Sequence, residues 1–214
     1  MSATAAEELR LGDARISWAL AMQADERRAL GRALLRRLLA DRLGTDVDFF
    51  AVCPRCGGPH GPLRVRAGRS VDEDPAPRVG VAYSGPLVVA GVAPREATSF
   101  AVDVELDTED RRRAVREAIG SDRVVDWTRI EAVAKARGTG LHGDFAATRI
   151  EAATRIEAAT RIEAATPDAT CEWRSPALDG SPALTGRDAR LTLPDGLVAV
   201  LSTATGRANL RGSA

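Results

Sequence analysis

The chain has 214 residues, and its 30 Lys and Arg residues balance its 30 Asp and Glu residues, so the formal net charge is zero. Such a balance provides no overall electrostatic attraction to nucleic acid, and we expect no nucleic-acid partner. The sequence begins without an apolar leader and contains no run of about 20 apolar residues, so we expect a cytoplasmic protein without a membrane partner.

The first half of the chain contains one clear helix signal and several strand signals. Residues 1–13 are polar, and we expect them to be frayed. Leucines recur at helical spacing over residues 30–39 with arginines on the other face, and Gly44 is placed to end that helix. We expect strands at the following residue ranges: 49–53, 64–65, 86–92 and 100–106.

The last of these strands carries two acidic residues. Side chains alternate along a strand, so Asp103 and Glu105 share one face, opposite Val102 and Val104. Two neighbouring carboxylates resist burial unless a cation neutralises them. A third carboxylate from a helix would complete the all-oxygen site that Mg²⁺ prefers. The simpler interpretation is a strand end with two solvated acids.

Lys135 is the only lysine of the chain. We expect a helix at residues 108–119 and a second that Asp126 caps and that ends near Gly138. On this second helix Glu131 and Lys135 share a face, because they are four residues apart. Lysine is a compact charge that can release a proton, unlike arginine, so a chain rich in arginine has reason to keep it. The simpler interpretation is a surface ion pair.

The order of these motifs resembles the 4'-phosphopantetheinyl transferases of the surfactin type. Asp-x-Glu on a strand is followed by Trp-x-x-x-Glu-x-x-x-Lys-x-x-Gly-x-Gly-Leu on a helix. Three earlier segments are similar to the family as well: the arginine-rich helix at 24–40, the Cys-x-x-Cys-Gly-x-x-His-Gly segment at 53–61, and residues 82–84, where the family has Ser-His-Ser. The resemblance covers residues 15–142.

This resemblance implies an α+β fold of two similar lobes related by a pseudo-twofold axis. Each lobe would be a small antiparallel sheet packed with helices, and the active site would lie in the cleft between them. The expected lobes are residues 1–98 and 99–214. The implied reaction transfers 4'-phosphopantetheine from coenzyme A to a serine of an acyl or peptidyl carrier protein and requires Mg²⁺.

The resemblance also assigns roles to individual residues. The implied Mg²⁺ ligands are Asp103, Glu105 and Glu131. Glu131 would also be the general base for the carrier serine, and Lys135 would neutralise charge on the coenzyme A phosphates. The implied coenzyme A contacts are His60, Tyr83, Ser84 and Lys135, with Ser84 in the pocket for the nucleotide 3'-phosphate.

Some positions depart from the family pattern. Tyr83 replaces the family histidine and cannot supply positive charge near neutral pH. Ile130 replaces a common lysine, and the connection from Glu105 to Trp127 is shorter than usual. These differences leave an alternative open, namely a non-catalytic relative that binds a carrier protein or a nucleotide without transfer.

Cys53 and Cys56 have the spacing of a zinc knuckle, but structural zinc needs four ligands. Distant Cys171 or His142 would have to complete such a site. The other interpretation is a glycine-rich turn that places His60 near the adenine or phosphate pocket. Without a secretory signal, three cysteines indicate reduced thiols.

The hexapeptide Thr-Arg-Ile-Glu-Ala-Ala occurs three times in tandem at residues 148–165. Its alanine and glutamate content favours a helix. The same pentad occurs at residues 128–132, but only that copy is followed by the lysine, so we assign the ligand to Glu131. We expect closing strands at 189–193 and 197–202, and we expect Trp173 to lie in the core.

Overall fold

The structure is a computed structural model, and it describes residues 5–44, 46–53, 56–59, 61–67, 76–138, 151–152, 171–175, 177 and 183–207. Within these residues the fold is α+β, with three helices and three antiparallel sheets. The helices are α1 (Arg27–Leu43), α2 (Glu109–Ile119) and α3 (Val124–Arg137). The strands are β1 (Glu7–Leu11), β2 (Ala14–Leu20), β3 (Val47–Ala51), β4 (Leu63–Ala67), β5 (Val79–Ser84), β6 (Leu87–Val92), β7 (Ala97–Leu106), β8 (Glu151–Ala152), β9 (Cys171–Ser175), β10 (Leu184–Thr192) and β11 (Val198–Arg207).

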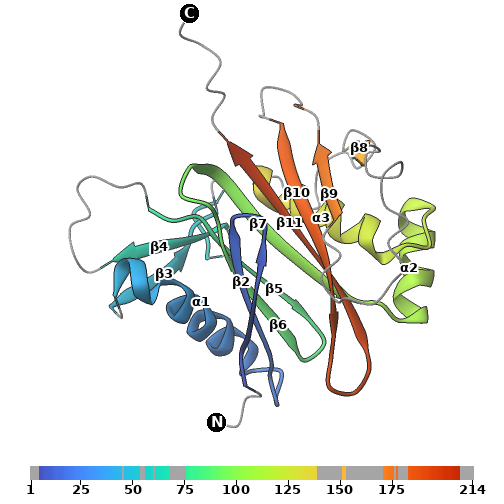
Figure 1. The fold of residues 1–214 in the computed structure, drawn as a ribbon, viewed down its shortest axis with the longest axis horizontal. Coiled ribbons are helices and arrows are strands. Elements are labelled where there is room, and N and C mark those ends of the chain that lie inside the picture. Colours follow the sequence, from blue (N-terminus) through green and yellow to red (C-terminus); the bar gives the residue numbers. More distant parts are fainter. Residues whose placement is uncertain are drawn as a thin grey trace, which may run out of the picture.

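The first sheet has the strand order β1-β2-β6-β5, and α1 covers its outer face (Figure 1). The leucines of α1 repeat every three or four residues and therefore form one apolar stripe. They pack on the side chains of β5 and β6 that point outward from the sheet. The predicted helix and its end at Gly44 are confirmed. Beside it, β3 and β4 form a separate two-stranded sheet.

The second sheet has the order β7-β11-β10-β9-β8, and α3 lies across its outer face (Figure 1). Before it, α2 begins where the Thr108 side chain accepts a hydrogen bond from the Arg111 backbone N–H at 3.2 Å, an ordinary N-cap. Under α3, a small core contains Val133 and Trp173. The expected core position of Trp173 is confirmed, because this side chain is fully buried.

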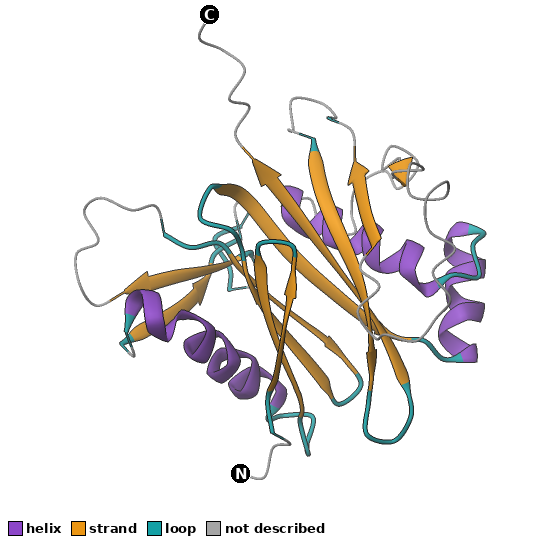
Figure 2. Cartoon of the chain, in the orientation of Figure 1, coloured by secondary structure: helices purple, strands orange, loops and turns teal. Residues whose placement is uncertain are grey.

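The inner faces of the two sheets pack on each other around the largest core. Ile16 and Trp18 come from β2, while Phe100 and Val102 come from β7. The layers therefore run α1, first sheet, second sheet, α3 (Figure 2). At one margin β5 passes close to β7, because Gly80 has no Cβ; a Cβ there would lie 3.1 Å from the Val102 backbone nitrogen.

The expectation of a frayed segment at residues 1–13 is wrong for its second half. Glu7–Leu11 forms β1, which pairs along its whole length with β2. The helix favoured for the tandem repeat is wrong at Glu151–Ala152, which forms β8 because its backbone pairs with β9. Residues 148–150 and 153–165 lie outside the described residues. The lobe boundary at residue 98 stays a prediction; β7 crosses it.

The expectations of no membrane partner and of a coenzyme A contact at His60 can be compared with the structure only in part. Among the described residues, every helix is too short or too polar to cross a lipid bilayer. His60 lies outside the described residues, so its expected position near coenzyme A stays a prediction.

Candidate functional site

The two acids of β7 lie where the alternation of the strand predicts. Asp103 and Glu105 are 2% and 7% exposed, and they face α3 rather than the core between the sheets. Val102 and Val104 point to the opposite side and belong to that core. These carboxylates are therefore buried, and they are not the solvated strand end of the simpler interpretation.

Lys135 connects the strand with the helix. Its ammonium group donates hydrogen bonds to Asp103 Oδ1 and, at 3.3 Å, to Glu131 Oε2. The i,i+4 pair of Glu131 and Lys135 is thus present, but it also bridges to a buried carboxylate 32 residues away in the sequence. Three of the predicted site residues consequently lie together, and the single lysine of the chain holds them.

Burial raises the pKa of Asp103 well above its usual value, and the nearby Glu131 raises it further, whereas Lys135 lowers it. The second carboxylate oxygen, Asp103 Oδ2, is buried and accepts no hydrogen bond within the described residues. Burial lowers the pKa of Lys135, but Asp103 and Glu131 more than offset this effect, and the pKa lies above its usual value. Lys135 is therefore a stable cation in contact with a carboxylate that still has an unused acceptor.

Glu105 is held by groups from two other elements. Ser84 on β5 donates a hydrogen bond to Glu105 Oε2 at 2.7 Å and accepts one from the Leu106 backbone N–H at 3.0 Å. On α2, Arg111 Nη2 lies 2.9 Å from the same oxygen. Burial raises the pKa of Glu105, while Ser84 and Arg111 oppose this shift. Ser84 thus joins the first sheet to the acidic residues.

We call this group of residues the carboxylate cluster: Ser84, Asp103, Glu105, Arg111, Glu131 and Lys135. It lies at the margin where β5 of the first sheet meets β7 of the second. Among the described residues, however, His, Cys, Asp and Glu side chains form no group of three or more that is arranged to hold a metal ion. The oxygens of the cluster instead accept from lysine, serine and arginine donors.

Tyr83 lies next to the cluster on the other side of β5, facing α1. The guanidinium of Arg27 is 5.9 Å from the centre of its ring, and Arg28 and Arg32 are close enough to lower its pKa. Burial raises the pKa of Tyr83 and outweighs these arginines. The ring is still 40% exposed. A surface with several cations therefore adjoins the carboxylate cluster.

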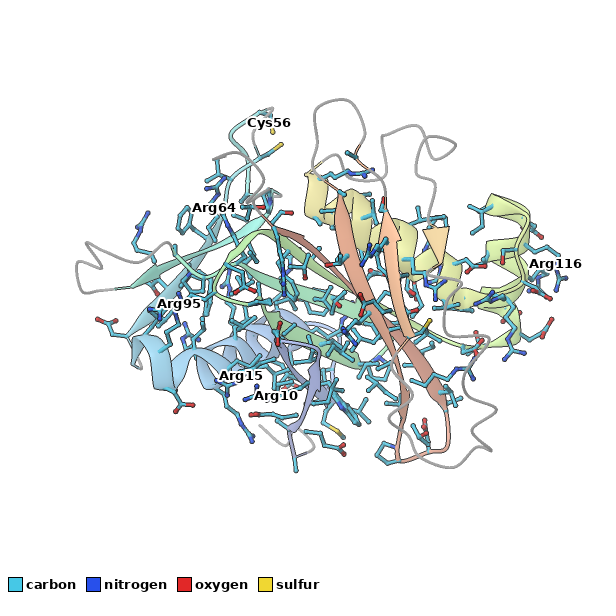
Figure 3. The ribbon with its side chains drawn as sticks, turned by 45° about the horizontal axis from the view of Figure 1, so that its top comes forward. Arg10, Arg15, Cys56, Arg64, Arg95 and Arg116 are labelled. Atoms are coloured by element: carbon cyan, nitrogen blue, oxygen red, sulfur yellow. The ribbon has the colours of Figure 1, made fainter. Side chains whose placement is uncertain are left out.

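The cysteine segment provides no described metal centre. Cys53 is buried, Cys56 is exposed (Figure 3), and neither forms a disulfide with a described residue. The Gly57 N–H donates to Cys53 O at 2.8 Å, and the Gly58 N–H donates to Cys56 Sγ at 3.4 Å, so the described backbone here bonds to the two cysteines. Because His60 lies outside the described residues, the structure does not decide between a zinc knuckle and the glycine-rich turn with His60 near the adenine or phosphate pocket.

A buried polar network that was not predicted from the sequence fixes α3 on the second sheet. Arg129 donates from Nε and Nη2 to Asp188 Oδ2 at 2.9 and 2.5 Å, and Trp173 and Ser202 each donate to Asp188 Oδ1 at 2.8 Å. Thr128 Oγ1 lies 2.7 Å from Ser202 Oγ. This network sets the position of Glu131, since Thr128 and Arg129 precede it on the helix. An arginine on a half-buried helix face was its only signal.

Comparison of the chain with protein-family models finds no match, and comparison with curated proteins finds none either.

Proposed function

We propose that this protein is a 4'-phosphopantetheinyl transferase with two similar lobes related by a pseudo-twofold axis. It would transfer phosphopantetheine from coenzyme A to a serine of an acyl or peptidyl carrier protein. The observation that carries the proposal is the carboxylate cluster, in which Asp103, Glu131 and Lys135 are in contact and Glu105 lies on the same strand face. These residues come from separate segments and match the family motif in type and order.

The three acidic residues of the cluster, Asp103, Glu105 and Glu131, fit Mg²⁺ in their chemistry, because they offer carboxylate oxygens as ligands. A buried carboxylate oxygen without a hydrogen bond, Asp103 Oδ2, is the kind of group that a cation satisfies. Asp103, Glu105 and Glu131 would hold the ion, which would neutralise charge on the pyrophosphate of coenzyme A. Lys135 and Arg111 now bind these carboxylates, so both cations would turn toward the phosphates when the ion is present.

The residues of the chain have distinct parts in such a reaction. Glu131 would accept the proton of the carrier serine, because it lies at the edge of the cluster with its side chain 14% exposed. Arg27, Arg28 and Arg32 on α1 would attract the nucleotide phosphates beside Tyr83. Ser84 would hold Glu105 in place through the hydrogen bond that it donates.

A second function is supported by specific observations. Tyr83 occupies the position of a family histidine, and each carboxylate of the cluster already has a lysine, serine or arginine partner through one of its oxygens. A non-catalytic relative that binds a carrier protein or a nucleotide would keep this arrangement without using a metal ion.

The two functions are separated by a transfer assay. The protein is incubated with coenzyme A, Mg²⁺ and a panel of carrier proteins that lack the prosthetic group, and intact-protein mass spectrometry follows the carriers. A transferase adds one phosphopantetheine to a carrier serine. No mass gain on any carrier, together with measurable binding of a carrier or of coenzyme A, supports the non-catalytic alternative.

A matched pair of variants assigns the base. Glu131→Gln should lower the rate by about 100-fold or more, since a positioned general base contributes 10²–10⁴-fold. Glu117→Gln on the exposed face of α2 makes the same chemical change away from the cluster and should leave the rate unchanged. Equal rates for the two variants would remove Glu131 from the mechanism.

A further inference from the structure

A second polar site lies on the inner face of the second sheet, where the first sheet no longer covers it. A pocket of about 370 Å³ opens between the β1–β2 turn, Pro94 and strands β9, β10 and β11. This volume is at the lower end of the range for small-molecule sites. Gly12 allows the β1–β2 turn to lie against Arg187 at the wall of the pocket. Its φ is +61°, and a Cβ there would lie 2.7 Å from Arg187 Nε.

The pocket is separate from the carboxylate cluster. The strand register places Thr203 opposite Val102, which belongs to the core between the sheets, and Ser202 opposite Asp103. Side chains alternate along a strand, so Thr203 and Thr205 face the inner side while Ser202 and Asp103 face α3. Ligand binding in this pocket is therefore independent of the proposed transferase function, because the pocket and the carboxylate cluster lie on opposite faces of the sheet.

Two rows of polar side chains cross the floor of the pocket. The register aligns Arg174, Thr185 and Thr205 in one row. Glu172, Arg187 and Thr203 form the next row. Farther along the same strands, this face carries Ala189, Leu191 and Leu201 of the core. The same face of the sheet is therefore apolar where the first sheet covers it and polar in the pocket, where its side chains can form hydrogen bonds with a ligand.

The lining has more positive than negative charge, with three arginines and two carboxylates. Arg187 Nη2 lies 2.6 Å from Glu172 Oε2, and Arg207 Nη2 lies 3.0 Å from Asp13 Oδ2. Arg174 forms no side-chain hydrogen bond or ion pair with any residue that the structure describes. A planar guanidinium without a partner, beside two others, suits the two oxygens of a carboxylate or phosphate.

The threonines of the pocket can accept hydrogen bonds, whereas its arginines can only donate them. Thr203 Oγ1 donates to Arg187 O at 3.2 Å, and Thr185 Oγ1 donates to Thr205 O at 3.5 Å. A hydroxyl whose hydrogen is engaged in this way still has lone pairs that accept hydrogen bonds. The Glu172 carboxylate also only accepts. The pocket thus places cationic donors and neutral or anionic acceptors next to each other in both rows.

From this arrangement we propose that the pocket binds a small hydroxylated anion, with its phosphate or carboxylate on Arg174 and its hydroxyl groups on Thr185 and Glu172. An anion without hydroxyl groups leaves the acceptors unused, and a neutral sugar leaves Arg174 without a partner. The ligand class is therefore that of sugar phosphates and sugar acids.

Isothermal titration calorimetry on the full chain tests this site with four probes. Ribose 5-phosphate and gluconate carry hydroxyl groups with a phosphate or a carboxylate, respectively; ribose is neutral, and inorganic phosphate has no sugar. We expect saturable binding of ribose 5-phosphate, gluconate or both. The one that binds more tightly shows whether the pocket prefers a phosphate or a carboxylate. The anion that binds should do so more tightly than ribose. No saturable heat from either anion up to about 10 mM overturns the proposal.

Two variants locate the binding. Arg174→Ala should weaken binding of the anion about 10–100-fold, the usual effect of losing a hydrogen bond to a charged group. Arg116→Ala, at the exposed end of α2 (Figure 3), should leave it unchanged. Thr185→Val should weaken binding of the hydroxylated anion about 2–10-fold and leave inorganic phosphate unaffected. Both pocket residues are exposed, so the thermal midpoints should not change. If Arg174→Ala binds the anion with unchanged affinity, the ligand does not bind at this pocket and the proposal is wrong.

Discussion

Lys135 and Asp103 form a contact in which the buried partner depends on the more exposed one. The Asp103 side chain is 4% exposed and that of Lys135 is 42% exposed. The ammonium is the only described cation that hydrogen-bonds to Asp103, so its removal leaves a buried carboxylate with no donor. A buried charge that loses its partner costs more than the ion pair itself contributes.

Lys135→Met should therefore lower the free energy of unfolding by about 1–2 kcal/mol at neutral pH, a value kept small because solvent screens the exposed ammonium. The double variant Lys135→Met with Asp103→Asn should recover part of this loss, since the amide is neutral. Urea unfolding of the two single variants and the double variant measures the coupling. Additive effects would show that the contact contributes nothing.

Tyr83 is the only tyrosine of the chain, so its ionisation can be followed directly. Burial raises the pKa of Tyr83 above 10.0, although Arg28, Arg32 and Arg27 oppose this shift. The folded protein then holds this proton more tightly than the unfolded chain. This contribution to stability is complete below about pH 10 and is lost as the pH rises through the folded-state pKa.

Absorbance titration of tyrosinate should accordingly give a midpoint above pH 10 in the folded protein and near 10 in urea. Tyr83→Phe should reduce the loss of stability at alkaline pH. A folded-state midpoint below that of the unfolded chain would mean that the arginines of α1, and not burial, control this side chain.

At the scale of elements, α3 is fixed to the second sheet by the pair of Arg129 and Asp188. Arg129 is 5% exposed, and the carboxylate of Asp188 is saturated by donors from Arg129, Trp173 and Ser202. Asp188→Asn would remove the closer counter-charge of this buried guanidinium and leave only Asp126, whose Oδ1 lies 3.7 Å from Arg129 Nη1. It should lower the free energy of unfolding by about 3 kcal/mol, the lower end of the range for a broken buried pair.

A matched comparison distinguishes this buried pair from surface pairs. Asp110→Asn removes an exposed partner of Arg113 and should change stability by less than about 1 kcal/mol in the same urea experiment. The double variant Arg129→Met with Asp188→Asn should be more stable than Asp188→Asn alone. If Asp188→Asn costs no more than Asp110→Asn, other contacts hold α3 in place.

Local patterns in the sequence predicted several elements and four of the six residues of the carboxylate cluster. Alternation along β7 placed Asp103 and Glu105 on one face, and the i,i+4 spacing paired Glu131 with Lys135. Both rules concern residues close together in the chain. The Lys135 contact with Asp103 and the Arg129 contact with Asp188 span 32 and 59 residues, and only the packing of α3 on the sheet brings them together. No local pattern contains that information.

The hairpin of β1 and β2, which was not predicted, has a similar explanation. β1 begins with two glutamates and lies at the edge of its sheet, so its outer residues are polar, and the segment has the composition of a frayed terminus. β2 is buried on both faces, with Trp18 in the core between the sheets and Ala19 in the core under α1, so burial along this strand does not follow a simple alternation. The pocket was not predicted either, because Gly12 and Arg187 meet only after the two sheets have packed.

For the whole molecule, the main question is whether residues 1–98 and 99–214 unfold as two lobes or as one unit. Each sheet has its own helix and its own outer core, which would allow separate folding. The largest core, however, lies between the sheets, and Ser84 on β5 hydrogen-bonds to Glu105 on β7. Neither sheet can bury its inner face without the other.

We therefore expect a single cooperative transition. Trp18 reports on the core between the sheets and Trp173 on the core under α3. The chain has a third tryptophan, Trp127, so it is replaced in two variants that keep Trp18 alone or Trp173 alone. Fluorescence and circular dichroism should give the same urea midpoint within each variant. Val102→Ala should lower stability by about 2 kcal/mol and shift both signals together. If it moves the Trp18 signal and leaves that of Trp173 in place, the lobes fold independently, because the loss of packing in the shared core would then not reach α3.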